Sequence, residues 1–348
     1  MIKIQNIYYM LSYAFTILNK KGYQNLATEE FENIADLYAA ILIKGVSTQL
    51  KNGLHHEYVE YNDSLKVIRG KINVTQSIEN LDMMNKRMNC TYEEFSINTY
   101  MNQILKTTMI TLLNVEISKE RKKNLKRLLL YFDKVETIDY RNIQWNFNFT
   151  RNNQAYKMLL SICKLIHDGM LQSEKNGNKQ LMTFEDEQQM SRLYEKFILE
   201  YYKKEYPQLT VTASHIPWSI EEASSLEMLP IMKSDIMITY KKRCLIIDAK
   251  YYKNTLNNYF ETKKIHSANL YQIFTYVKNQ SVNLKDKDIT VSGMLLYAKT
   301  DENVIPDDTF QMSGNQVSVK TLDLNQDFKV ITEQLNQIVE KNFNLTSY

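Results

Sequence analysis

The stretch that decides the fold is residues 231–253, IMKSDIMITYKKRCLIIDAKYYK. Two apolar runs rich in β-branched residues, 236–239 and 244–247, flank a polar pair at 241–242. Short apolar runs on either side of a two-residue polar tip are typical of an antiparallel hairpin. The stretch therefore predicts two neighbouring strands, and the position of the tip predicts which of their residues face one another.

Two carboxylates and an ammonium group are expected to meet on one face of this hairpin. With the loop centred on 241–242, Asp235 falls opposite Asp248, and the Cβ atoms of facing residues lie roughly 5 Å apart. Because side chains alternate along a strand, Lys250 shares the face of Asp248. Two close carboxylates repel unless a cation lies between them, and Mg²⁺ is a hard cation that takes oxygen ligands. We expect a Mg²⁺ site here; the alternative is an exposed hairpin with ordinary surface charges.

The order of these residues resembles a known nuclease signature. Asp235, followed by Asp248-Ala249-Lys250, is similar to the D…(D/E)xK motif of the PD-(D/E)xK nuclease superfamily. Ser234 stands in the place of the signature proline, which is commonly replaced. The resemblance implies Mg²⁺-dependent hydrolysis of a phosphodiester, with the metal held by Asp235, Asp248 and the backbone carbonyl of Ala249. Lys250 would orient the attacking water or neutralise charge that develops on the phosphate.

Three further residues extend this resemblance. Gln272 and Tyr276 have the QxxxY spacing of RecB-like nucleases, and residues four apart share one face of a helix. The resemblance implies that they hold a phosphate oxygen or the catalytic Lys250. Glu195 lies in a predicted helix before the catalytic strands, where many nucleases of the superfamily carry an additional acidic metal ligand. For Glu195, a solvated position on the helix surface is the alternative.

The resemblance narrows to McrC, the family of nuclease subunits of McrBC restriction systems. Segments that agree in order and spacing are distributed along nearly the whole chain: 4–14, 44–46, 53–54, 69–72, 248–253 and 266–272. The resemblance implies an endonuclease subunit of a bacterial defence system that cuts double-stranded DNA containing 5-methylcytosine. It also implies a partner, an McrB-like AAA+ ring, whose GTPase this chain stimulates and which gates cleavage. The alternatives are a non-catalytic adaptor that binds and stimulates the ring, and a free-standing RecB-like DNA nuclease.

The expected organisation is two domains in a mixed α/β chain. Residues 1–152 are expected to form a domain of helices and strands that docks on the GTPase partner. Residues 153–348 are expected to form the PD-(D/E)xK domain, with a central mixed sheet flanked by helices. Within the first domain, 54–74 predicts strands, and the resemblance implies a projecting element that contacts the ring through Arg69 and Lys71. The alternative for this element is an ordinary β-hairpin.

Composition excludes several other classes of protein. The chain has 348 residues and a net charge of only +3, so it is no uniformly basic nucleic-acid coat. No GxxxxGK[ST] motif occurs, so we expect this chain to bind no nucleotide through a P-loop. The three cysteines are isolated and no segment has the apolar length of a membrane span, which favours a cytoplasmic protein. The basic run 119–127 could contact phosphate, although a solvated helix face is the preferred interpretation.

Overall fold

The structure is a computed structural model that describes residues 2–15, 18, 23–150, 153–175, 187–222, 227–251, 256–259, 262–299 and 306–345. Contacts within the chain group it into two compact units. One, which we call the terminal unit, combines Met1–Glu30 with Thr183–Tyr348; the other, the middle unit, is Phe31–Met182. Tyr252 and Lys253, which end the stretch quoted at the outset, lie outside the described residues.

This division differs from the expected boundary between residues 152 and 153. Helix α1 (Ile4–Ala14) belongs to the terminal unit because its apolar face packs on helix α7 (Glu187–Glu205). The side chain of Asn6 is buried, and its Nδ2 donates to the backbone carbonyl of Leu324 at 2.7 Å. The first helix of the chain therefore completes the C-terminal fold, and residues 1–152 do not form one compact domain.

Four helices form the core of the middle unit. They are α2 (Ile34–Asn52), α4 (Tyr100–Leu113), α5 (Lys119–Leu129) and α6 (Gln154–Lys175), with short 3-10 turns at η4 (Leu130–Phe132) and η5 (Tyr140–Asn142). Three of them begin at a polar residue whose side chain accepts a backbone N–H of the first turn: Asn33, Thr99 and Ser118. Helix α6 was expected in the C-terminal domain, but its apolar face packs against α2 and α4. Helix α6 therefore belongs to the middle unit, and the expected boundary after residue 152 does not separate the two units.

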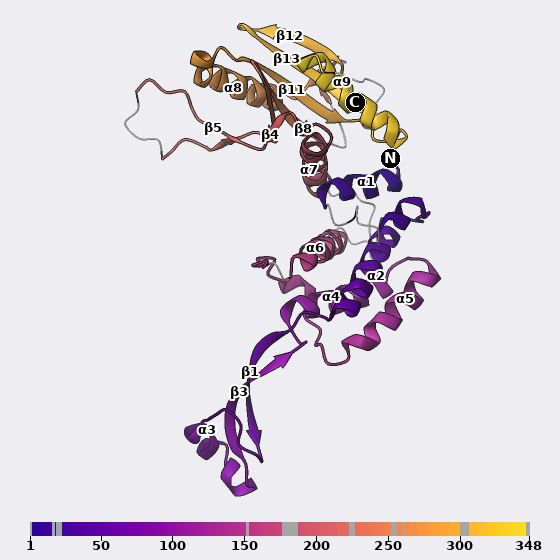
Figure 1. The fold of residues 1–348 in the computed structure, drawn as a ribbon, viewed down its shortest axis with the longest axis vertical. Helices are drawn as coiled ribbons and strands as arrows, with labels where there is room; N and C mark the ends of the chain where they lie inside the picture. Colours follow the sequence, from indigo (N-terminus) through magenta and orange to yellow (C-terminus); the bar gives the residue numbers. More distant parts are fainter. Residues whose placement is uncertain are drawn as a thin grey trace. The chain divides into compact units, whose positions relative to one another are not determined.

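A three-stranded sheet projects from these helices as an arm (Figure 1). Its strands, in the order β1-β3-β2, are β1 (Glu57–Leu65), β3 (Met88–Ser96) and the short β2 (Lys71–Ile72). The antiparallel β1–β3 ladder runs from the pair Glu57 and Ser96 near the helices to the pair Leu65 and Met88. Helix α3 (Val74–Glu79) and the turn η3 (Asp82–Asn85) follow at the far end. Two strands lie within the predicted span 54–74, β1 and the two-residue β2, whereas residues 66–70 are not strand and Val74 begins α3.

The terminal unit is built on a six-stranded mixed sheet in the order β12-β13-β11-β8-β7-β4. β11 lies parallel to both β8 and β13, whereas the other neighbouring pairs are antiparallel. The strands are β4 (Thr210–Thr212), β7 (Ile236–Tyr240), β8 (Arg243–Lys250), β11 (Thr290–Ala298), β12 (Asp308–Met312) and β13 (Asn315–Leu322). Two smaller strand pairs are β5 (His215–Ile216) with β6 (Met232–Lys233) and β9 (Leu256–Tyr259) with β10 (Thr262–Ile265).

Helices flank this sheet, which confirms the predicted mixed α/β class. They are α1, α7, α8 (Ser267–Asn283) and α9 (Phe328–Phe343), with 3-10 turns η2 (Gln24–Thr28) and η6 (Lys285–Lys287). Ile273 and Val277 of α8 form one apolar cluster with Ile246 of β8 and Leu295 of β11. Gly293 lets α8 approach β11 closely, since a Cβ at that position would lie 2.6 Å from Cγ2 of Val277. The face of β8 that carries Ile246 is therefore the face covered by α8.

Candidate active site

The hairpin that carries the candidate residues has the predicted register. β7 and β8 are antiparallel, with Tyr240 paired to Arg243 and Ile236 paired to Ile247. Lys241 in the tip has a φ of 51°, which the tight two-residue turn requires. The ladder ends at the pair Ile236 and Ile247, and Asp235 lies in a bend directly before β7, next to the strand position that would face Asp248.

Asp235 is also held from the neighbouring strand. The backbone N–H of Ala249 donates to Oδ2 of Asp235 at 2.9 Å. Because side chains alternate along β8, the methyl group of Ala249 points to the opposite face from Asp248 and Lys250 and is fully buried there. The hairpin thus brings Asp235, Asp248 and Lys250 together on the face covered by α8.

Burial dominates the electrostatics of the carboxylate pair. Asp248 is 1% exposed, and this burial raises its pKa to about 7, with the Lys250 charge lowering the pKa and the Asp235 charge raising it. Burial also raises the pKa of Asp235, against the lowering effects of Lys250 and the Ala249 N–H. Without a cation between them, the pair therefore stays partly protonated near neutral pH.

A chain of polar contacts links the pair to α8. Nζ of Lys250 lies 2.9 Å from Oδ2 of Asp248 and donates to Oε1 of Gln272 at 3.2 Å. Nε2 of Gln272 in turn donates to the hydroxyl of Tyr276 at 2.9 Å. Gln272 and Tyr276 share one helix face, as predicted, and Gln272 contacts Lys250, whereas Tyr276 contacts Gln272. The contacts hold the ammonium group from two sides.

Glu195 lies at the edge of the same site. It is half-buried on α7, where Oγ of Ser191 donates to its Oε1 at 2.9 Å. Burial raises the pKa of Glu195, and the nearby charge of Asp235 raises it further, while Lys250 lowers it. The charge of Glu195 is therefore coupled to the charges of Asp235 and Lys250.

The donor set suits a hard divalent cation. Oδ2 of Asp248 is buried, and its one charged neighbour in the described site at ion-pair distance is Nζ of Lys250 at 2.9 Å. In the described part of the chain, no three His, Cys, Asp or Glu side chains lie close enough together to hold a metal ion by themselves. Two carboxylates and a backbone carbonyl fit Mg²⁺ better than a closed all-protein cage, because Mg²⁺ keeps several waters and also binds substrate phosphate.

One buried pair beside the site was not predicted. Tyr297 on β11 is the ladder neighbour of Lys250, and its hydroxyl accepts a hydrogen bond from Nδ2 of Asn269 at 3.0 Å. Both side chains are buried. The sequence contains no local signal for this contact, because the parallel β8–β11 pairing joins segments that are far apart in the chain.

The two residues proposed to contact the partner lie in the arm, which belongs to the middle unit. Arg69 is engaged along the side of the arm: its guanidinium stacks on the ring of Tyr92 at 4.6 Å and lies 3.6 Å from Glu94. Lys71 begins β2 and is exposed. The end of the arm instead presents exposed apolar side chains, among them the adjacent residues Met83 and Met84. The sequence did not predict this surface.

A comparison with protein families places the chain. A family model described as McrBC 5-methylcytosine restriction system component matches residues 3–298. The chain belongs to this McrBC family. The match spans both the arm and the Asp235–Asp248 hairpin, so it covers every site residue named above.

Individual proteins of known kind are similar to this chain. The chain is similar to the type IV methyl-directed restriction enzyme EcoKMcrBC of Escherichia coli strain K12, with 28% identity over 345 residues and 98% of each chain covered. Among solved structures, it is similar to a half-complex of Thermococcus gammatolerans McrB AAA+ hexamers with bound McrC, at 17% identity and a TM-score of 0.49 over 94% of this chain and 76% of that one. A second structure, the Thermococcus gammatolerans McrBC complex, has 20% identity and a TM-score of 0.42 over 58% of each chain.

No helix in the described part of this McrBC family member has the length and apolar character that crossing a bilayer requires.

Proposed function

We propose that this chain is the Mg²⁺-dependent endonuclease subunit of a modification-dependent restriction system and cuts double-stranded DNA that contains 5-methylcytosine. The observation that carries the proposal is the buried pair Asp235 and Asp248 with Lys250 2.9 Å from Asp248. A buried pair of like charges is unfavourable for folding, so a functional role accounts for it better than stability does. Membership of the McrBC family supports DNA carrying 5-methylcytosine as the substrate.

The metal would be held by Asp235, Asp248 and the backbone carbonyl of Ala249, with Glu195 as a further acidic group at the edge. When bound, Mg²⁺ supplies a more acidic water as nucleophile and withdraws charge from the phosphate. The burial of Asp248, which is 1% exposed, supports this assignment because a buried carboxylate needs a compensating positive charge. The partly protonated carboxyl pair supports it too, since a cation lets both groups ionise.

The other residues of the site would stabilise charge on the phosphate or position the residue that does so. Lys250 directs its positive charge to the place where negative charge develops on the phosphate during attack. Gln272 accepts from Lys250, so it orients the ammonium group and restricts its rotation. The hydroxyl of Tyr276 holds the amide of Gln272 in that orientation and can also donate to a phosphate oxygen. The two hydrogen bonds that link Tyr276 to Gln272 and Gln272 to Lys250 therefore hold the ammonium group of Lys250 in place before substrate binds.

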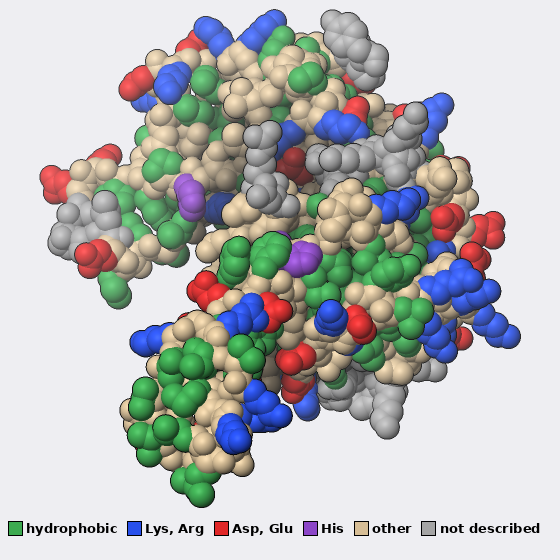
Figure 2. All heavy atoms as spheres, turned by 60° about the horizontal axis from the view of Figure 1, so that its bottom comes forward, with side chains coloured by type: hydrophobic (Ala, Val, Ile, Leu, Met, Phe, Trp, Pro, Cys, Tyr) green, Lys and Arg blue, Asp and Glu red, His purple; other side chains and the backbone are tan. Residues whose placement is uncertain are grey.

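The arm supports a protein partner for this nuclease. Large apolar side chains at its far end are exposed, among them Ile78 at 58%, Leu81 at 60% and Met84 at 80%. Figure 2 shows hydrophobic side chains gathered on a protruding lobe, with Lys and Arg side chains next to them. Exposed apolar groups of this kind mark a protein interaction site. We propose that the arm docks on an McrB-like AAA+ ring that hydrolyses GTP, with Arg69 and Lys71 on its flank, and that docking stimulates the GTPase.

Two other functions would use only part of this structure. A non-catalytic adaptor would need the arm but not the carboxylate pair with its ordered lysine. A free-standing RecB-like nuclease would need the pair but not the apolar end of the arm. The single chain has both, which favours a nuclease gated by a partner. The lack of a P-loop assigns GTP hydrolysis to that partner, and both are proposed to act in the cytoplasm.

The test is an Asp248→Asn variant assembled with the GTPase partner, GTP and methylated DNA. We expect cleavage to stop while stimulation of the GTPase persists, because Asn removes the charge and keeps the shape. The control is Asp288→Asn, which removes an exposed carboxylate of the same unit and should leave both activities unchanged. Normal cutting by Asp248→Asn would refute the nuclease assignment, and loss of stimulation in the folded variant would refute the separation of cutting from docking.

A further inference from the structure

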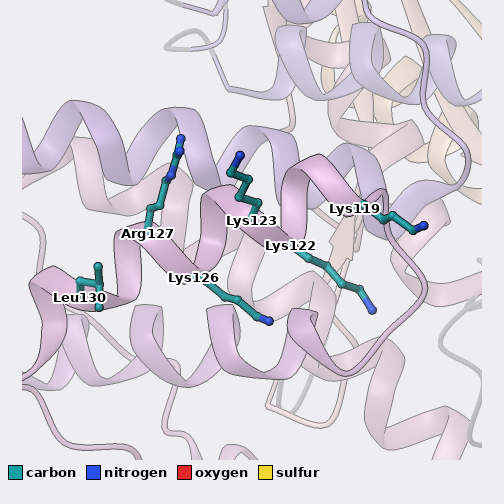
Figure 3. Close-up of a pocket in the computed structure, with 6 residues that line it drawn as sticks. All are labelled: Lys119, Lys122, Lys123, Lys126, Arg127 and Leu130. Atoms are coloured by element: carbon teal, nitrogen blue, oxygen red, sulfur yellow. The ribbon is translucent and has the colours of Figure 1, made fainter.

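The outer face of helix α5 in the middle unit is strongly basic. Two rows of cations run along the helix, one formed by Lys119, Lys123 and Arg127 and the other by Lys122 and Lys126 (Figure 3). Residues four apart lie one above the other on a helix surface. Together with Leu130, the five cations line an open hollow on this face.

These cations are available to a ligand. None of the five forms an ion pair with another residue in the part of the chain that the structure describes. The opposite face of α5 holds the helix in place, because Leu125 and Leu128 are buried and Arg121 pairs with the buried Asp36 at 3.0 Å. The rows are therefore presented outward by a helix whose other side is anchored. The whole chain has a net charge of only +3, so five cations on one helix face are a local concentration of positive charge.

We propose that the outer face of α5 binds the sugar-phosphate backbone of double-stranded DNA without regard to base sequence. The inference rests on the proposed function for its choice of DNA, and it assigns a second contact outside the catalytic cluster. Lysine and arginine make the phosphate contacts that position a protein on a duplex. The centres of protein–protein interfaces are instead depleted of lysine, and the apolar surface that suits a protein partner lies at the end of the arm.

The spacing of the rows matches such a ligand. From Lys119 to Arg127 the helix rises about 12 Å at about 1.5 Å per residue. One DNA strand presents a phosphate about every 3.4 Å along the helix axis, so three or four phosphates lie alongside this row. The second row can follow the same strand or contact its complement across a groove. Lysines are point charges on flexible stems, which suits contacts that do not discriminate between sequences.

The test is the salt dependence of DNA binding by the full chain in EDTA, where no cleavage occurs. The variant replaces Lys122, Lys123, Lys126 and Arg127 with Gln, which keeps helix propensity. A fluorescent duplex is titrated over a salt series by anisotropy. If each cation contacts a phosphate, the slope of log K against log salt concentration becomes shallower by about 3 to 4, at about 0.9 per contact. The matched control replaces the exposed lysines Lys285, Lys287, Lys329 and Lys341 of the terminal unit with Gln and should change the slope little.

Each other outcome overturns the inference. An unchanged slope in the α5 variant, an equal change in both variants, or no measurable binding by the wild-type chain would each show that α5 is not a DNA surface. Loss of GTPase stimulation with an unchanged slope would assign this face to the protein partner instead. Because binding is measured without metal, the result is independent of whether Asp235 and Asp248 support cleavage, and failure of the nuclease proposal leaves this measurement interpretable.

Discussion

Asp235 and Ala249 are joined across the hairpin by a hydrogen bond in which the backbone N–H of Ala249 donates to Oδ2 of Asp235 at 2.9 Å. Ala249 stands between Asp248 and Lys250 in β8, so this bond ties Asp235 to the strand that carries the other two groups. The separation of the two carboxyl groups is thereby set by backbone geometry. A cation would bind to a pair that the fold has already assembled.

Replacing Asp235 separates its charge from its hydrogen bond. In Asp235→Asn the amide oxygen can still accept from Ala249, and one of two repelling charges is gone, so the metal-free protein should be as stable as the wild type or more stable. In Asp235→Ala the N–H of Ala249 loses its acceptor, which costs about 1–3 kcal/mol. Thermal unfolding in EDTA compares the three proteins. Adding Mg²⁺ should then raise the Tm of the wild type alone; an equal rise in Asp235→Asn would exclude Asp235 as a ligand.

The contacts between α8 and Lys250 should affect rate in graded steps. Gln272→Ala removes the hydrogen bond that Lys250 donates to Gln272, and Tyr276→Phe removes the one that Gln272 donates to Tyr276. A hydrogen bond to a charged group contributes about 1.5–3 kcal/mol, which corresponds to a loss of about ten- to a hundred-fold in rate for Gln272→Ala. Tyr276→Phe, one contact further away, should lose less, and Lys250→Ala should lose most.

Single-turnover cleavage of methylated DNA, with the partner and GTP present, measures these three rates. The control is Tyr271→Phe, on the same helix with its ring exposed. Wild-type rates for both Gln272→Ala and Tyr276→Phe would show that this face of α8 serves only to pack on the sheet.

His167 should make the middle unit sensitive to acid. Its Nε2 lies 2.7 Å from Oγ1 of Thr108 in the core, and burial lowers its pKa to about 4. Because the folded pKa lies below the ordinary value of 6.5, the unfolded chain binds the proton first, and stability falls as pH drops from about 6.5 toward 4. At about 1.4 kcal/mol per pKa unit the loss attributable to His167 is on the order of 3 kcal/mol.

Urea unfolding at a series of pH values checks this for the wild type and for His167→Gln. The difference between the two stability curves isolates His167 from the other groups that titrate in this range. The stability advantage of the wild type over His167→Gln should decrease steadily below pH 6.5, because the unfolded wild type takes up a proton at His167 and the variant does not. Parallel curves would mean that the imidazole is protonated as easily in the folded chain as in the unfolded one.

Gly293 should tolerate no side chain. A Cβ there would lie 2.6 Å from Val277 and 2.9 Å from Ile273, both on α8. Gly293→Ala should therefore cost about 1–3 kcal/mol through overpacking and should displace the helix that carries Gln272. Denaturant unfolding measures the cost, and Gly314→Asn, at an open turn position with a φ of 86°, serves as the control. A variant as stable as the wild type would show that α8 can retreat freely from the sheet.

The end of the arm should matter to the partner more than its flank does. Replacing Met83 and Met84 with Gln removes exposed apolar surface and should weaken stimulation of the GTPase, while DNA cleavage chemistry in the fully assembled complex is retained. The matched control replaces two exposed apolar residues of the terminal unit, Met228 and Ile231, with Gln. A parallel Lys71→Ala variant tests the flank. Titration of the GTPase rate against each variant gives the apparent affinities, and equal values for all would remove the arm from the docking surface.

Local periodicity in the sequence predicted the parts of the site that lie close together along the chain. The two apolar runs around 241–242 determine the hairpin and its register, because a strand alternates every two residues and a slip of one would turn the buried face to water. The spacing of four between Gln272 and Tyr276 determines their common helix face for an equally local reason. The pair Asp235 and Asp248 and its neighbour Lys250 follow from the register alone.

Only the tertiary structure decided what surrounds those residues. Burial by α7, α8 and β11 raises the pKa of Asp248 and brings Glu195 and Tyr297 to the site, and no local pattern encodes which distant segments supply that cover. The same holds for the units: α1 joins the terminal unit and α6 the middle one because their apolar faces fit partners far away in the chain. A sequence records that a face is apolar, whereas the choice of partner depends on the packing of the whole chain.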